Sequence, residues 1–315
     1  MKIFKKNRSG ALEISFGWLF AIIAGIVIIF LAIYLSSKLI GTQQESISAE
    51  TGTEIETLLN PLETSFESSQ TTSISIPTET RINNKCNLIG TFGEQLIQLD
   101  QKSFNKWVET DVNVNFHNKY LFSNSEITGK KFYIFSKSFN FPFKIADLIY
   151  ITSANDRYCF VNAPNEIVKE LSELNQSNII LENCGEEDIQ VCFGTGKCDI
   201  NVDFTSNFVK KNNTKLYFTN VEDSRTLMYA AIFSDKATYE CQVKRLMMRV
   251  KELSSLYIRK ELIVKEKGCE DNLGGSLGIL SELAGNLNNS NELEIVKISA
   301  DDVNEKNDAG GCFLW

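Results

Sequence analysis

The chain has 315 residues, of which 43% are hydrophobic and 23% charged, and its formal net charge is −8. The ordinary apolar fraction excludes a wholly disordered or collagen-like chain. The acidic balance argues against a nucleic-acid partner, which would require a basic face. A single histidine, His117, makes a His-rich metal site improbable, and no cofactor or metal is expected.

The amino terminus predicts a membrane anchor. A basic leader (residues 1–10) precedes an apolar segment (11–40) that is uncharged from Ile14 to Leu35. As a helix that stretch spans ~33 Å, enough to cross the ~30 Å core of a lipid bilayer. Because the basic residues precede the span and Glu45 and Glu50 follow it, we expect a single-pass protein with a cytoplasmic N-terminus and an extracellular C-terminal domain. A cleaved signal peptide is the alternative, but the apolar run is long and no small-x-small site follows it.

Glu13 lies between the leader and the apolar run. This arrangement resembles the class III signal peptides of archaeal type IV pilin-like proteins. The resemblance implies processing between Gly10 and Ala11, and pairing of Glu13 with a neighbouring subunit's terminal amine during assembly. Glu13 would then be the third mature residue, whereas the fifth is commoner in such families. The whole chain, ending in GGCFLW, also resembles uncharacterised surface proteins of small-genome archaea.

Gly17, Ala21 and Gly25 recur every four residues within the apolar segment. This spacing places small side chains on one helix face, where another backbone can approach closely. We therefore expect association with copies of the chain or with other envelope proteins through this face. The alternative is that these residues reflect the ordinary composition of membrane helices.

Residues 41–80 predict a stalk or linker. Apolar residues recur there with helical spacing, which indicates a helix to about Asn60 and a second one opening at Pro61. A short strand is predicted at 71–77. The alternative is a solvated spacer. The apolar positions are Ile47, Ile55, Leu58, Leu59, Leu62 and Phe66.

Residues 81–315 predict an extracytoplasmic α+β domain, possibly of two subdomains, because strands and helices mix without regular alternation. Helices are expected at 165–175, at 236–260 and over a leucine repeat from Leu273 to Leu287. Strands are expected at 130–153 (two, around Pro142), 157–162, 178–184, 189–194, 198–204, 215–220 and 293–299.

The helix expected at 236–260 carries an apolar face and many basic residues. We expect the basic residues to form a solvated face opposite the core. The alternative is a patch for anionic headgroups or an acidic partner. The residues are Lys244, Arg245, Arg249, Lys251, Arg259 and Lys260.

All eight cysteines follow the apolar segment, and an even number outside the membrane predicts up to four structural disulfides. No C-x-x-C pattern supports a zinc site or a thiol oxidoreductase. The pairing is left open among Cys86, Cys159, Cys184, Cys192, Cys198, Cys241, Cys269 and Cys312. Asn175, Asn212 and Asn288 match the N-glycosylation pattern.

Catalytic motifs are missing: the chain contains no P-loop, GxSxG or HExxH sequence. Its Gly-Thr-Gly-Lys run at 194–197 lacks the full phosphate-loop spacing, and a tight hairpin turn is expected there. We therefore expect no enzyme and no catalytic residues. The function expected is a pilin-like, membrane-anchored cell-surface structural or adhesion subunit. The alternatives are a non-polymerising envelope protein whose ectodomain binds a partner or ligand, and an enzyme with an unrecognised site.

Overall fold

The computed structural model describes residues 17–39, 71–103, 105–194, 196–219, 225–268, 272–310 and 313–315. The chain divides into two units, residues 1–47 and 48–315, which we describe separately. The described part of the first unit is one helix, Gly17–Leu39. The described part of the second unit is an α+β domain, which confirms the predicted fold class.

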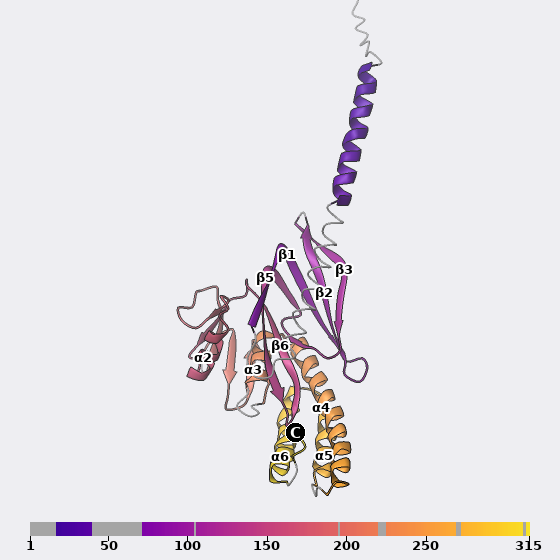
Figure 1. Cartoon of the computed structure of the whole chain (residues 1–315). Helices are drawn as coiled ribbons and strands as arrows, with labels where there is room; N and C mark the ends of the chain where they lie inside the picture. The colour runs from indigo at the N-terminus through magenta and orange to yellow at the C-terminus, as the bar shows by residue number, and fades with distance from the viewer. Residues whose placement is uncertain are drawn as a thin grey trace, which may run out of the picture. The chain divides into compact units, whose positions relative to one another are not determined.

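A mixed sheet, here called sheet A, forms the largest part of the domain (Figure 1). Its strand order is β3-β2-β1-β5-β6-β4, and all neighbours are antiparallel except β4 and β6. The strands are β1 (Thr71–Asn87), β2 (Glu94–Ser103), β3 (Lys106–Phe116), β4 (Tyr120–Phe122), β5 (Glu126–Asn140) and β6 (Lys144–Ser153). β1 runs across the expected boundary between residues 80 and 81.

A second, smaller sheet, sheet B, has the order β12-β11-β10-β9-β7-β8. Its first four strands in sequence are parallel, and β11 and β12 add antiparallel neighbours. The helix α2 (Asn165–Glu173) connects β7 to β8. The strands are β7 (Tyr158–Val161), β8 (Ile179–Ile180), β9 (Ile189–Phe193), β10 (Ile200–Asp203), β11 (Phe208–Lys211) and β12 (Thr214–Tyr217).

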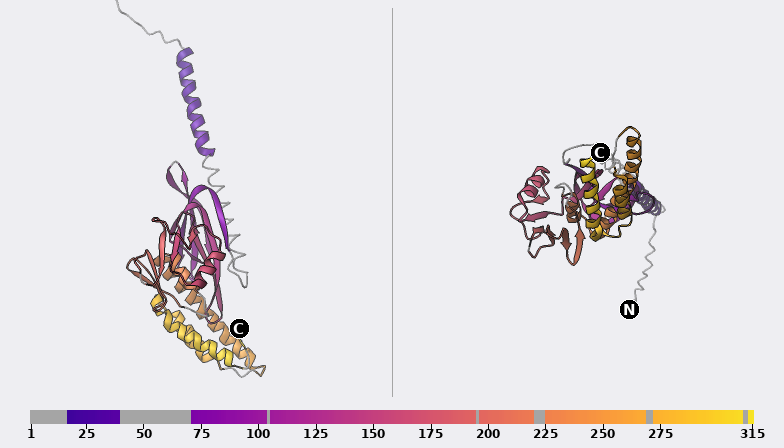
Figure 2. Two further views of the ribbon diagram at one scale, coloured as in Figure 1. Left: turned by 90° about the vertical axis from the view of Figure 1, so that its left-hand side faces the viewer. Right: turned by 90° about the horizontal axis from the view of Figure 1, so that it is seen from below.

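The remaining helices follow both sheets in sequence. They are α3 (Thr226–Phe233), α4 (Lys236–Lys265), α5 (Gly274–Gly285), the short 3-10 turn η1 (Ser290–Glu292) and α6 (Leu293–Ala309). Asp235 caps α4 by accepting a hydrogen bond from the Thr238 amide at 2.9 Å. α5 packs on α4 and α6 packs on α5, so the three long helices lie side by side (Figure 2).

An aromatic core joins sheet A to the helices. The ring of Phe135 on β5 stacks on Tyr150 of β6 at 4.4 Å between centroids and meets Phe233 of α3 edge-on at 5.7 Å. Such pairs add to the free energy gained by burying apolar area. A separate hydrophobic cluster, which includes Ile82, Ile97 and Phe132, is formed by residues of sheet A.

The structure confirms most of the predicted elements from 130 to 287, including two strands around Pro142 and the helix at 236–260, which extends to Lys265. The strand predicted at 293–299 is wrong, because these residues open the helix α6. Its buried residues, Leu293, Val296, Ala300 and Val303, are spaced by three and four, and half of that pattern lies beyond residue 299.

Candidate functional site

The N-terminal helix Gly17–Leu39 has 23 residues, and its most apolar window of 18 residues has a mean hydropathy of 2.8, with none of that window buried inside the structure. At ~1.5 Å per residue it is long enough to cross a bilayer core. A membrane anchor or a signal sequence explains such a helix. The residues expected at the processing site, Gly10 and Ala11, and the acidic Glu13 lie outside the described residues.

The small-residue face of this helix is open. A Cβ added at Gly17 or at Gly25 would meet no atom within 4 Å, and Ala21 between them is exposed. The large side chains around the rest of the helix, such as Trp18 and Phe30, are exposed as well. Packing of this face against another helix stays a prediction from its spacing.

Three disulfides brace the α+β domain, as predicted. Cys86–Cys241, Cys159–Cys184 and Cys192–Cys198 have Cα–Cα distances of 6.1, 5.6 and 6.0 Å. Cys269 and Cys312 lie outside the described residues. Disulfides persist in oxidising compartments, which fits a location outside the cytoplasm.

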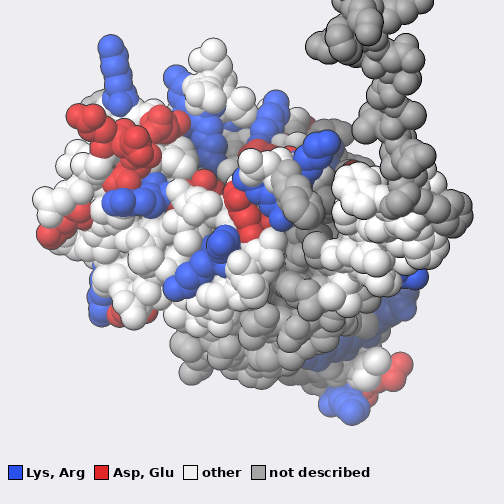
Figure 3. Space-filling view, turned by 90° about the horizontal axis from the view of Figure 1, so that it is seen from above, with Lys and Arg blue, Asp and Glu red and all other residues white. Residues whose placement is uncertain are grey.

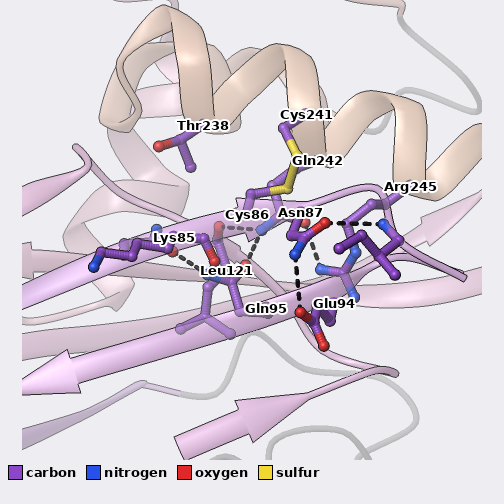
Figure 4. The surroundings of a disulfide bond; sticks show 12 residues. Lys85, Cys86, Asn87, Glu94, Gln95, Leu121, Thr238, Cys241, Gln242 and Arg245 are labelled. Atoms are coloured by element: carbon purple, nitrogen blue, oxygen red, sulfur yellow. Dashed lines mark hydrogen bonds between the residues drawn. A yellow bond between two sulfur atoms is a disulfide. The ribbon is translucent and has the colours of Figure 1, made fainter. Parts of the chain in front are cut away.

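The bridge Cys86–Cys241 ties the end of β1 to α4, and a buried polar network lies beside it (Figure 4). The Gln242 side chain of α4 donates hydrogen bonds to Gln95 Oε1 and, at 3.1 Å, to the Leu121 carbonyl. Gln95 donates in turn to Asn84, which donates to Ser123 Oγ at 2.7 Å. A buried side-chain amide is unfavourable without a hydrogen-bond partner, so these amides hold one another in this arrangement. The network thereby fixes the position of α4 on sheet A.

The predicted solvated face of α4 included Arg245. This is wrong, because Arg245 is fully buried. Its guanidinium donates to three backbone carbonyls, those of Phe92 (3.1 Å), His117 (2.9 Å) and Lys119 (2.9 Å), and to Gln242 Oε1 (2.9 Å). It also lies 4.9 Å from the centre of the Tyr120 ring. Burial lowers the pKa of Arg245 to about 10, so the side chain stays charged at neutral pH. One arginine thus holds the β1–β2 and β3–β4 connections against α4.

Gly93, in the β1–β2 connection, permits this arrangement. Its φ is +62°, and a Cβ there would lie 2.5 Å from the Asn87 carbonyl oxygen and 2.9 Å from Arg245 Cγ. We expect Gly93→Ala to destabilise the domain by about 1–3 kcal/mol, because both the backbone and the arginine stem must shift. Gly90→Ala is the matched control: its φ is also positive but its added Cβ meets nothing. Thermal unfolding of both variants checks this, and equal losses would contradict the crowding argument.

Two buried lysines have strongly lowered pKa values. Burial lowers the pKa of Lys211 to about 7, and burial followed by the nearby Arg225 charge lowers that of Lys137 to about 8. Lys211 Nζ donates to the carbonyls of Ile232 and Ser234, both at 2.6 Å, and Lys137 pairs with Glu170 of α2. These contacts attach α3 and α2 to neighbouring strands, which gives both lysines a structural explanation.

A polar pocket of about 590 Å³, here called the sheet B pocket, surrounds the connection from β9 to β10. These strands are parallel, so the hairpin turn predicted at 194–197 is wrong; the bridge Cys192–Cys198 closes the connection instead. Among the described residues, no group of three or more His, Cys, Asp or Glu could hold a metal ion. The pocket is lined by Glu186, Asp188, Gln190, Gly196, Lys197, Cys198, Asp199, Asn201, Lys210 and Asn212.

The sheet B pocket contains both hydrogen-bond donors and hydrogen-bond acceptors. Asp188 pairs with Arg157 at 3.0 Å, and Asp199 accepts the Gln190 amide at 2.9 Å. The Oδ1 atom of Asn201 is buried and has no hydrogen-bond partner in the part of the chain that the structure describes. A small polar ligand with hydroxyl groups could satisfy such a mixture of donors and acceptors.

The three predicted glycosylation residues, Asn175, Asn212 and Asn288, are all exposed. The hydroxyl of Ser290, which completes the Asn288 pattern, is buried and donates to Glu240 at 2.7 Å.

Seen from above, Lys and Arg are interspersed with Asp, Glu and uncharged residues on the described surface (Figure 3). That face therefore offers no continuous basic field for a polyanion.

No protein-family model, no curated protein and no solved structure matches this chain. The function is therefore inferred from the chain's own residues and geometry.

Proposed function

We propose that the chain is a pilin-like, membrane-anchored cell-surface subunit. Its apolar helix packs in the bilayer against copies of itself or other envelope proteins, and the disulfide-braced domain faces outward for a structural or adhesive role. The observation that supports this most strongly is the open face of Gly17, Ala21 and Gly25 on an unburied apolar helix. Three disulfides in the following domain support the outward location.

The resemblance at the amino terminus gives the proposal its first test. Mass spectrometry of the purified protein's N-terminus should find Ala11 as the first residue, because a class III leader is removed after Gly10 while the apolar helix is retained. An intact Met1 would contradict the pilin-like part of the proposal. Electron microscopy of sheared surface material then separates a filament subunit from a lone anchor.

Assembly gives the second test. Replacing Gly17, Ala21 and Gly25 together by Ile should lower the yield of chemically cross-linked oligomers in membranes by about tenfold, because branched side chains on this face prevent the close approach of another backbone. The matched control is Leu19→Ile, Ile23→Leu and Ile26→Leu, which keeps apolar side chains on the opposite face. Both variants should remain in the membrane fraction. Unchanged oligomers in the first variant would support a lone anchor.

A non-polymerising envelope protein that binds a ligand is the second candidate. The sheet B pocket favours it, because its unpartnered Asn201 Oδ1 and its mixed charges suit a small polar ligand. Under this alternative, the chain is processed or anchored as above but remains a monomer in membranes, and Asn201→Leu weakens retention of the ligand.

A further inference from the structure

A groove with two arginines runs along α4, where the sequence favours a solvated basic face and leaves a patch for an acidic partner as the alternative. Its volume is about 340 Å³. Phe92 of the β1–β2 connection completes the groove, whose other lining residues lie within eleven positions of α4: Arg249, Glu252, Leu253, Ser255, Leu256 and Arg259. We call these seven residues the α4 groove.

The α4 groove offers apolar surface to a partner. Leu256 is 57% exposed and Phe92 is 39% exposed, and Ile263, two turns beyond Leu256, is 57% exposed. Leu88 and Ile89 of the same β1–β2 connection are also exposed. A groove with exposed apolar residues framed by charged ones is typical of interaction surfaces.

The net positive charge of the α4 groove favours an acidic partner. Arg249 and Arg259 outnumber Glu252, and the Nε–H of Arg249 is buried with no hydrogen-bond partner among the described residues. A buried donor without a partner is costly, and a carboxylate is the acceptor that an arginine binds most strongly. An amphipathic helix with glutamates beside its apolar stripe would satisfy both features of the groove.

The chain itself contains such a sequence outside the described residues. No Lys or Arg occurs between Lys38 and Arg81. The segment 41–70 carries six glutamates, and helical spacing would bring Glu50 and Glu54 beside its apolar stripe. Its charge is therefore complementary to the α4 groove in any register.

The position of β1 favours a segment from another molecule. The segment 41–70 joins the domain at Thr71, the first residue of β1, whereas Phe92 follows the other end of that strand. The seventeen residues of β1 place Thr71 and Asn87 roughly 50 Å apart, so a segment of the same chain would have to run back along the whole strand to reach Phe92. A second copy, displaced along this direction, would bring its own acidic segment to the groove of its neighbour.

We propose that the α4 groove binds the acidic segment 41–70 of a second copy of the chain, an inference that rests on the proposed self-associating function. The apolar stripe then packs on Leu256 and Phe92, and its glutamates pair with Arg249 and Arg259. This contact lies outside the membrane and is independent of the Gly17, Ala21 and Gly25 face.

Photo-cross-linking of the full-length protein in native membranes tests the proposal. p-Benzoylphenylalanine in place of Leu256 should give a product of two chains, with the cross-link mapped by mass spectrometry to residues 41–70. Charge reversal by Arg249→Glu and Arg259→Glu should lower its yield by about tenfold. Adding Glu50→Lys and Glu54→Lys to the same chain should restore it. Lys130→Glu and Lys169→Glu, two exposed positions away from α4, give the control with the same net charge.

A second cross-linker, in place of Ala21, separates this inference from the proposed function. If the Ala21 product forms but Leu256 gives none, or links to its own chain, the groove proposal is overturned while self-association stands. If neither position links two chains, both proposals fail. An unchanged Leu256 product after charge reversal also overturns the pairing of Arg249 and Arg259 with glutamates.

Discussion

Replacing both Cys86 and Cys241 by Ser is expected to cost the domain about 5 kcal/mol of unfolding free energy. The two residues are 155 positions apart in sequence, and in the chain-entropy account a cross-link stabilises more as the loop it closes lengthens. The bridge also fixes the end of β1 on α4 next to the buried Gln95–Gln242 contact. For a domain of this size the loss corresponds to a fall of roughly 10–20 °C in melting temperature.

The double variant Cys192→Ser, Cys198→Ser is the matched control, because its loop spans six positions and the same account gives about 2 kcal/mol. Calorimetry or circular dichroism of the full-length protein in detergent measures both melting temperatures. Equal falls for the two variants would show that loop length does not set the stability. If the first variant does not fold, its loss from the membrane fraction beside a folded control is the readout.

Arg245→Met is expected to lower the unfolding free energy by about 3–5 kcal/mol. Methionine keeps most of the buried apolar stem but leaves the carbonyl oxygens of Phe92, His117 and Lys119 without their donor. Each unsatisfied buried acceptor costs about 1–3 kcal/mol. We also expect the β1–β2 and β3–β4 connections to exchange their amide hydrogens faster, because the arginine is what joins them to α4.

Arg259→Met, about four turns further along the same helix and exposed, is the control and should change stability by less than about 0.5 kcal/mol. Arg245→Lys should recover part of the loss, since an ammonium offers three donors but not the planar fork of a guanidinium. Urea unfolding of the three variants decides the matter. A loss for Arg245→Met no larger than that for Arg259→Met would refute the role assigned to the buried guanidinium.

Local patterns identified much of the fold where a segment is dense in aromatic and branched residues or repeats apolar residues with helical spacing. The two strands around Pro142 and the apolar face of α4 are examples, and both are confirmed. β2 escaped prediction because its buried face contains Gln95 and Gln101 while Leu96 is less buried. α3 escaped because all eight of its residues are buried, which removes any periodic signal.

Some features of the candidate sites follow from the sequence, and others depend on the tertiary structure. The apolar helix, its small-residue face and the bridging of cysteines follow from composition and spacing alone, because length, side-chain size and an even cysteine count are properties of the sequence. The pairing of Cys86 with Cys241, the burial of Arg245 and the α4 groove do not. A charged residue on a helix surface is solvated unless distant loops cover it, and only the tertiary structure brings residues 92, 117 and 119 to α4.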